Sequence, residues 1–217
     1  QTNLYLGVRG WLLAFWLLAT PGYLGAQFTQ YTWNGAIDSD WLTVSNWSGL
    51  SVAPTGGTHA VRLNVQNGTG NTLVYDASFG HTIYNPTSGA TARALVLGNP
   101  GSASMIISGG VFESQALNPD IIGNGVNTSG GLSSLTVAGG DYVNTNGGAR
   151  TLVVNNGGAA GVTGIFTVAS GSAAISNLQL GVSGNAGQAI VNLNGGILYA
   201  NIIKGLGAGA TKTFNFN

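Results

Sequence analysis

Cysteine is absent from all 217 residues, and charged residues are scarce. If the protein is secreted, the absence of cysteine excludes a disulfide scaffold and leaves its stability to non-covalent packing. Charged residues make up 6% of the chain, against roughly 25% in an average soluble domain. The six basic and six acidic side chains balance, so no net field attracts DNA, RNA or anionic lipid. The composition therefore argues against a nucleic-acid-binding protein.

The helix formers Glu, Lys and Arg are nearly absent, whereas glycine occurs 37 times among many Asn, Ser, Thr, Ala and Val residues. Such residues favour strands and turns over helices. Low charge is also typical of disordered polar tracts, but 44% of the residues are hydrophobic and they recur at regular spacing, which argues against disorder. The composition predicts an all-β protein.

The first 26 residues have the pattern of a secretory signal peptide. Arg9 is their only charge, the run Trp11–Ala19 is apolar, and Ala26 offers a small residue at a plausible cleavage point. The apolar run is too short to cross roughly 30 Å of hydrocarbon as a helix. We therefore predict a signal peptide over residues 1–26, a secreted or cell-surface location, and no membrane span in the mature chain.

Residues 27–91 differ from the remainder because they hold three tryptophans within a short stretch, namely Trp33, Trp41 and Trp47. Aromatic rings present apolar faces on which sugars stack, so these residues are candidate carbohydrate ligands. Alternatively, they plug the open end of a stacked domain, where the first coil has no neighbour. We favour the plug and predict a Trp-rich β cap, with the first coils, over residues 27–91.

From residue 105 onward one phrase recurs, in which two apolar residues flank a residue that is polar in every copy except the first, where it is Ile106, and small or glycine residues follow. Its copies are Met105–Gly110, Leu135–Gly140, Phe166–Gly171, Val191–Gly196 and the partial Phe214–Asn217. They begin at residues 105, 135, 166, 191 and 214, so successive copies are 30, 31, 25 and 23 residues apart. Self-similarity at such periods is typical of stacked repeats, in which no unit buries its apolar face alone.

Two further elements recur around each copy. One precedes it at Leu95–Gly98, Asp120–Gly123, Leu152–Asn155 and Leu178–Gly181, and one follows it at Phe112, Tyr142, Ala173 and Leu198. Each repeat thus supplies about three short strands, whose alternate side chains face opposite sides. The predicted inward pairs are Met105/Ile107, Leu135/Val137, Phe166/Val168, Val191/Leu193 and Phe214/Phe216.

Equivalent strands are connected by more than a dozen residues, which parallel pairing requires. Residues 92–217 therefore predict a parallel β-helix, or β-solenoid, of about four to five coils of 23–31 residues. A β-sandwich is the competing all-β fold, but it gives no reason for whole phrases to recur in register. Ser170, Asp120 and Lys204 depart from the repeat, and we expect register slips or local bulges there.

These phrases, Leu-x-Leu-Gly followed by Leu-x-Leu-x-Gly-Gly over residues 92–217, resemble the autotransporter-associated β-strand repeat. The Trp-rich stretch from Trp33 to Pro54 is similar to the segment that often opens such proteins. The resemblance implies a right-handed β-helix passenger on the surface of Gram-negative bacteria, with an adhesive or matrix role. Because the phrase restarts at Phe214–Asn217, we expect further coils of the same full-length protein after Asn217.

Catalytic patterns are missing from the sequence. It has no Gly-x-Ser-x-Gly elbow, no phosphate loop and no Ca²⁺-binding nonapeptide, and its two isolated histidines make no triad or zinc site. Glu113 and Asp141 are expected on neighbouring coils as solvated surface charges, and Asp38 and Asp40 as turn caps. We predict a non-catalytic protein without catalytic residues, metal or cofactor.

The sequence thus favours a secreted or cell-surface structural or adhesive β-solenoid that presents a polar surface to polysaccharide or other cell-surface molecules. The alternative is a carbohydrate-binding or carbohydrate-active, lyase-like β-helix that uses Trp33, Trp41 and Trp47.

Overall fold

The computed structural model describes residues 29–48, 53, 56–59, 61–66, 71–86, 92–98, 101–124, 131–157, 161–182 and 187–217. The predicted signal peptide and its cleavage point lie outside these residues. The described chain is all-β, with 60% strand and 4% helix, which confirms the predicted all-β composition of the fold. Within these ranges, no helix combines the length and the apolar character that a membrane crossing demands.

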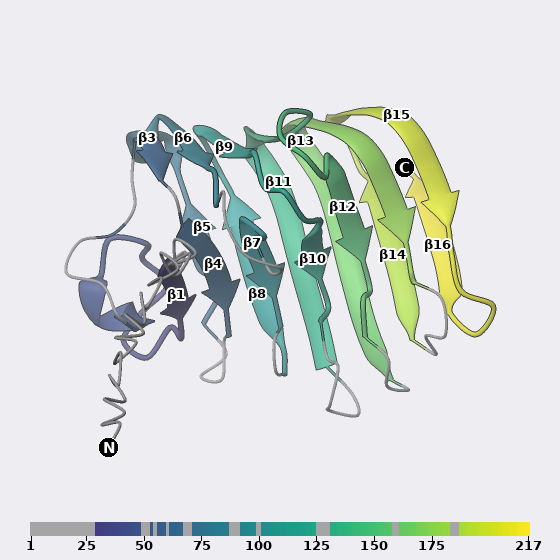
Figure 1. The fold of residues 1–217 in the computed structure, drawn as a ribbon, viewed down its shortest axis with the longest axis horizontal. Coiled ribbons are helices and arrows are strands. Elements are labelled where there is room, and N and C mark those ends of the chain that lie inside the picture. Colours follow the sequence, from purple (N-terminus) through teal and green to yellow (C-terminus); the bar gives the residue numbers. More distant parts are fainter. Residues whose placement is uncertain are drawn as a thin grey trace, which may run out of the picture.

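Sixteen strands form one curled sheet in which stacked strands lie side by side along the long axis (Figure 1). Following the chain, they fall into three rows. Row one contains β5 (Leu73–Tyr75), β8 (Ala103–Ile107), β14 (Gln188–Leu193) and β16 (Thr211–Phe216). Row two contains β3 (Gly57–His59), β6 (His81–Tyr84) and β9 (Val111–Ser114). Row three contains β1 (Thr29–Trp33), β4 (Val61–Val65), β7 (Leu95–Leu97), β10 (Asp120–Ile122) and β12 (Thr151–Val154).

Three long strands join the rows. β11 (Gly131–Asn144) runs through rows one and two, β13 (Val162–Leu180) through all three, and β15 (Ile197–Gly205) through rows two and three. Every pairing between described strands is parallel except that of β1 with β2 (Trp47–Ser48). Two short 3₁₀ turns, η1 (Val44–Asn46) and η2 (Ala77–Phe79), complete the described elements. The predicted parallel pairing is therefore confirmed.

The repeated phrases align residue for residue. In row one, one inward column consists of Leu73, Met105, Leu135, Phe166, Val191 and Phe214. All of these except Phe214 are fully buried, and Phe214 packs against them from the end of the column. In row two, the predicted slots Phe112, Tyr142, Ala173 and Leu198 also stack in register. The core is thus a set of columns that run from coil to coil.

The three departures from the repeat have different outcomes. Ser170 pairs with Ala138 where the register between β11 and β13 shifts, so the expected local bulge is confirmed there. Gly171 follows with φ +74, and a Cβ at this position would lie 2.1 Å from the carbonyl oxygen of Gly140. The expectation was wrong for the other two residues, because Asp120 pairs in register with Leu152 and Lys204 with Gln179.

Truncation of a column residue is the direct test of this packing. We expect Phe166→Ala to lower the free energy of unfolding by about 3–5 kcal/mol, because it leaves a cavity in place of a fully buried aromatic ring. Thr167→Ala, one residue along on the outer face, is the matched control and should cost less than about 1 kcal/mol. Urea denaturation followed by circular dichroism measures both. Equal losses in the two variants would contradict the assigned inner and outer faces.

Candidate functional site

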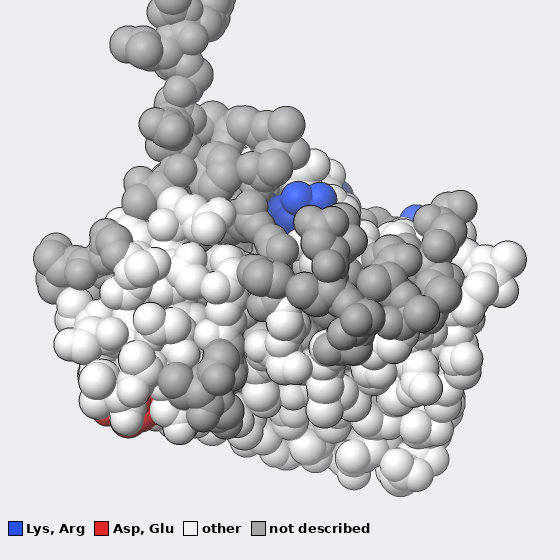
Figure 2. All heavy atoms as spheres, turned by 90° about the horizontal axis from the view of Figure 1, so that it is seen from below, with Lys and Arg blue, Asp and Glu red and all other residues white. Residues whose placement is uncertain are grey.

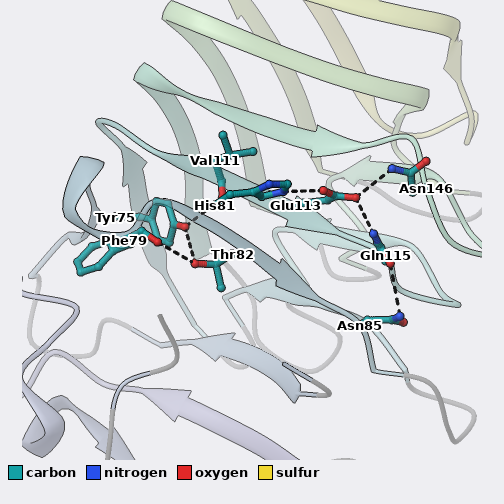
Figure 3. Close-up of polar contacts among 9 residues, drawn as sticks. All are labelled: Tyr75, Phe79, His81, Thr82, Asn85, Val111, Glu113, Gln115 and Asn146. Atoms are coloured by element: carbon teal, nitrogen blue, oxygen red, sulfur yellow. Dashed lines mark hydrogen bonds and ion pairs between the residues drawn. The ribbon is translucent and has the colours of Figure 1, made fainter. Parts of the chain in front are cut away.

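The surface offers few charged groups from which a site could be built. Figure 2 shows one face of the molecule, on which nearly all described atoms belong to uncharged residues. A set of polar side-chain contacts that joins three coils lies on the outer side of row two, around Glu113 (Figure 3). We call this set the Glu113 cluster, and it comprises His81, Asn85, Glu113, Gln115 and Asn146.

Strand alternation and register bring the cluster together. Thr82 and Phe112 are fully buried, so their neighbours His81 and Glu113 direct their side chains outward. In the β6–β9 pairing His81 lies opposite Val111 and Ile83 opposite Glu113. His81 and Glu113 are therefore diagonal neighbours on adjacent strands, within reach for long side chains.

The carboxylate of Glu113 accepts hydrogen bonds from side chains of three coils. Its Oε2 lies 2.7 Å from Nε2 of His81, and its Oε1 accepts from Nε2 of Gln115 at 2.6 Å and Nδ2 of Asn146 at 2.9 Å. Asn85 donates in turn to Gln115 at 3.4 Å. The Glu113 side chain is 8% exposed and that of His81 is 51% exposed, so a buried carboxylate orients a half-exposed imidazole.

Burial raises the pKa of Glu113, but hydrogen bonds from Asn146, Gln115 and His81 outweigh it and hold the pKa below its ordinary value of 4.5. The carboxylate is therefore ionised at neutral pH. An ionised carboxylate only accepts hydrogen bonds, so the imidazole donates to it through Nε2. The expectation that Glu113 is a solvated surface charge was wrong, because its side chain is buried and satisfied by neighbours.

Asp141 lies on the strand next to Glu113, opposite Val111 in the β9–β11 pairing. The prediction that the two carboxylates occupy neighbouring coils is confirmed. Asp141 accepts a hydrogen bond from the Ser172 hydroxyl at 2.6 Å. The two carboxylates thus accept hydrogen bonds from different side chains, Glu113 from His81, Gln115 and Asn146, and Asp141 from Ser172.

On the inner side of the same strands, Tyr75 anchors row one to row two. Its hydroxyl lies 2.9 Å from Oγ1 of Thr82 and 3.0 Å from the carbonyl oxygen of Val111, to which it donates. The Thr82 hydroxyl donates to the carbonyl of Phe79 at 3.2 Å (Figure 3). The Glu113 cluster is therefore mounted on a hydrogen-bonded inner layer.

A second polar group lies inside the stack, where Asp120 replaces an apolar column residue and is fully buried. Its Oδ1 accepts from the backbone N–H of Leu95 at 2.9 Å. Its Oδ2 accepts from the Tyr142 hydroxyl at 2.7 Å and from Asn144 at 3.2 Å. Burial raises the pKa of Asp120, and the hydrogen bonds oppose this only in part. Burial, together with the charge of Asp120, raises the pKa of Tyr142 as well.

These two groups differ in what they can do chemically. The Asp120 group is fully buried in the core, so it can affect the stability of the fold but cannot contact a ligand. The Glu113 cluster presents an imidazole and amides, which can donate to and accept from the hydroxyl groups of a ligand. In the part of the chain that the structure describes, no three His, Cys, Asp or Glu side chains gather as a metal ion would require.

The three candidate tryptophans lie in the core at the N-terminal end of the stack. Trp33 and Trp41 are 0% exposed and Trp47 is 5% exposed. Trp41 makes edge contacts with Trp47 at 5.0 Å and with Tyr75 at 5.2 Å, and Trp47 donates to the Trp41 carbonyl at 2.8 Å. Sugar stacking needs an exposed ring face, and the burial of these rings gives that prediction no support.

Asp38 and Asp40 lie in the turn before Trp41. Oδ1 of Asp38 accepts from the backbone N–H of Asp40 at 2.9 Å, and Oδ1 of Asp40 accepts from that of Leu42 at 2.8 Å. The prediction that these carboxylates cap local backbone groups is confirmed.

No protein-family model, curated protein or solved structure matches this chain. The resemblance to the autotransporter-associated repeat therefore rests on the phrases themselves.

The pKa of Asp120 gives a test by pH. Because its folded-state pKa lies above the ordinary value of 3.8, its contribution to stability is complete below that value and is lost as pH rises through the folded-state pKa. Asn at this position cannot ionise, so we expect the urea midpoint of the wild type to decrease relative to that of Asp120→Asn as pH rises from about 3.5 to 8. Parallel midpoint curves for the two proteins would contradict an ionising, buried Asp120.

The pKa of Glu113 is shifted in the opposite direction to that of Asp120. Its lowered pKa means that its contribution to stability is present above 4.5 and is lost as pH falls through the folded-state pKa. We expect Glu113→Ala to lower the free energy of unfolding at pH 7 by about 1–3 kcal/mol, because it removes an ionised acceptor that receives hydrogen bonds from three side chains. Asp141→Ala, which removes the hydrogen bond from Ser172, is the control and should lower the free energy of unfolding by less. An effect of Glu113→Ala that persists unchanged at pH 3 would show a packing loss instead.

Proposed function

We propose that this protein is a non-catalytic structural or adhesive β-solenoid that acts outside the cell and binds polysaccharide through the outer face of row one. The observation that carries the proposal is a series of side-chain ladders on that face. Nδ2 of Asn192 donates to Oγ1 of Thr167 at 3.3 Å, and Nδ2 of Asn215 donates to Oδ1 of Asn192 at 2.8 Å. The hydroxyls of Ser104 and Ser134 pair at 3.0 Å on the same row.

Such ladders create a repeating polar surface. Neighbouring strands are spaced by about 4.8 Å, so the hydroxyls and amides of one outward column recur at that interval over four consecutive strands, at Thr136, Thr167, Asn192 and Asn215. Lys212 is the only charged residue among the strand residues that form row one. A polysaccharide also repeats neutral hydroxyl groups along its length, and a rigid ladder can hydrogen-bond to it without the cost of burying charge.

The finer architecture that we propose is a right-handed parallel β-helix. The chain visits rows one, two and three in the same order in each successive coil from β8 to β15. Parallel crossover connections are right-handed in about 98% of cases, which supports the hand. The leader-like residues 1–26 support export, and the resemblance to the autotransporter-associated repeat supports a place at the bacterial surface.

One observation favours a second candidate, a carbohydrate-binding or carbohydrate-active β-helix. The Glu113 cluster holds a half-exposed imidazole beside the side-chain amides of Gln115 and Asn146. A ligand bound there would contact row two and not row one. The two candidates thus place the ligand on different faces.

Binding to insoluble polysaccharides separates the two candidates. We expect the ladder variant Thr167→Val/Asn192→Val/Asn215→Val to lose affinity at least tenfold, because valine keeps strand propensity but removes the hydrogen-bonding groups. His81→Ala should bind like the wild type. Asn201→Val, an exposed residue of β15 outside row one, is the matched control, and circular dichroism verifies folding of all variants.

The reverse result, with loss in His81→Ala and none in the ladder variant, would favour the second candidate. If the folded wild type is retained by none of a panel of neutral and acidic polysaccharides, the adhesive proposal fails.

A further inference from the structure

Two arginines lie in one column at the corner where row two turns into row three. The N–H of Asn118 donates to the carbonyl of Ala92, so Asn118 pairs with Arg93 of the preceding coil. The register of β10 with β12, continued backward, places Asn118 opposite Arg150 of the following coil. Arg93 and Arg150 therefore occupy equivalent positions two coils apart, with Asn118 between them.

This column concentrates positive charge in a chain that has little of it. The structure describes four basic side chains, namely Arg93, Arg150, Lys204 and Lys212, and two of them lie here. On the next two coils the column continues through Ser176 and Asn201. The corner therefore presents two cations without an acidic side chain in the same column.

The guanidinium group of Arg93 is half-buried without an anionic hydrogen-bond partner among the described residues. Its Nε is buried and makes no hydrogen bond to them. Burial lowers the pKa of Arg93, and the charge of Asp120 opposes this. The Asp120 carboxylate itself accepts from the N–H of Leu95, from Tyr142 and from Asn144. Asp120 thus supplies charge but no hydrogen bond, and a guanidinium in this state favours a bound anion.

Arg150 is held in a conformation that is unusual for its residue type. Its φ of 48° lies in the left-handed region, where residues other than Gly and Asn carry strain. Asn155 is the other non-glycine residue with positive φ among the described residues, and asparagine tolerates this region. Nε of Arg150 donates to the carbonyl of Gly147 at 2.9 Å, which orients the exposed guanidinium. Its terminal amino groups have no acceptor among the described residues.

Leu117 gives this corner an apolar surface beside the arginines. It precedes Asn118 in the chain and is 50% exposed. The Leu117 side chain lies over the next coil, since a Cβ built on Gly148 would be 3.1 Å from Cδ2 of Leu117. Sugars combine apolar C–H faces with polar edges, so an exposed leucine next to two guanidinium groups suits an acidic sugar better than a small inorganic anion.

The spacing of the arginines discriminates among anionic polymers. Two strand intervals separate their backbone positions, about 9.6 Å. An extended peptide advances about 3.3 Å per residue, so side chains on one of its faces recur at about 6.6 Å and do not match. A sugar unit in an extended β-1,4-linked chain spans about one strand interval, and every second unit directs its carboxylate to the same side. An acidic polysaccharide that runs along the stack therefore matches both arginines.

We propose that Arg93, Leu117, Asn118 and Arg150, which we call the arginine corner, bind an acidic β-1,4-linked polysaccharide whose chain runs along the stack. The carboxylates of two units, separated by one intervening unit, pair with the two guanidinium groups through their terminal amino groups. The intervening unit passes over Leu117. This site is separate from the neutral ladders of row one, so the two proposals can fail independently.

Titration calorimetry with β-1,4-linked oligomannuronates tests the site. A trimer is the shortest oligomer that reaches both arginines, so we expect its affinity to exceed that of the dimer about tenfold. Arg93→Gln and Arg150→Gln should each weaken trimer binding at least tenfold, and added salt should weaken it in the wild type. Neutral β-1,4-mannotriose should not bind at the corner, because it has no carboxylate. Lys204→Gln, which removes a charge at an outward position of row three, is the matched control and should bind like the wild type.

Arg150→Gln changes an exposed side chain and keeps a side-chain-bearing residue at the same φ, so it should fold normally and tests the site even if Arg93→Gln unfolds. A wild type that does not bind the trimer, or trimer binding that Arg150→Gln leaves unchanged, would overturn the proposal. Tighter binding of polyglutamate than of oligomannuronate would assign the corner to an acidic polypeptide and also overturn it. Loss of trimer binding in the row-one ladder variant alone would move the acidic ligand to row one, which contradicts this site and supports the proposed function.

Discussion

In-register stacking of parallel strands is the constraint on which the rest of this structure depends. Each phrase places its apolar residues above those of the preceding coil, so backbone pairing and core packing specify the same register. Phe166, for example, lies between Leu135 and Val191 in the backbone pairing and is fully buried. A slip of one residue would turn every inward side chain outward, and the repeated apolar columns therefore select a single alignment.

Polar groups enter this stack only where neighbouring coils complete their hydrogen bonds. Asp120 occupies a column position because Tyr142 and Asn144, from another row, reach its carboxylate. On the outer face Glu113 is satisfied by His81, Gln115 and Asn146, which come from different coils. Such groups are compatible with a β-stack because they join coils laterally, and their partners are specific to one register.

The two ends of the stack differ in whether the repeat is interrupted. At the N-terminal end an antiparallel strand and buried indoles interrupt the repeat, whereas at the C-terminal end the columns finish in exposed Ile203 and Phe216. The proposed polysaccharide-binding face uses the outward polar residues of row one, whereas the inward residues of the same strands form the buried columns.

The repeated phrases determined the all-β class, the parallel pairing, the inward columns and the bulge at Ser170, because strand alternation and period are local properties of a sequence. They could not reveal the His81–Glu113 pair, whose members are 32 residues apart and meet only through the lengths of the intervening coils. They also could not decide whether Trp33, Trp41 and Trp47 are exposed, or that Asp120 stays in register. Only the tertiary structure decided these points, because burial and hydrogen-bond partners depend on which coils lie next to each other.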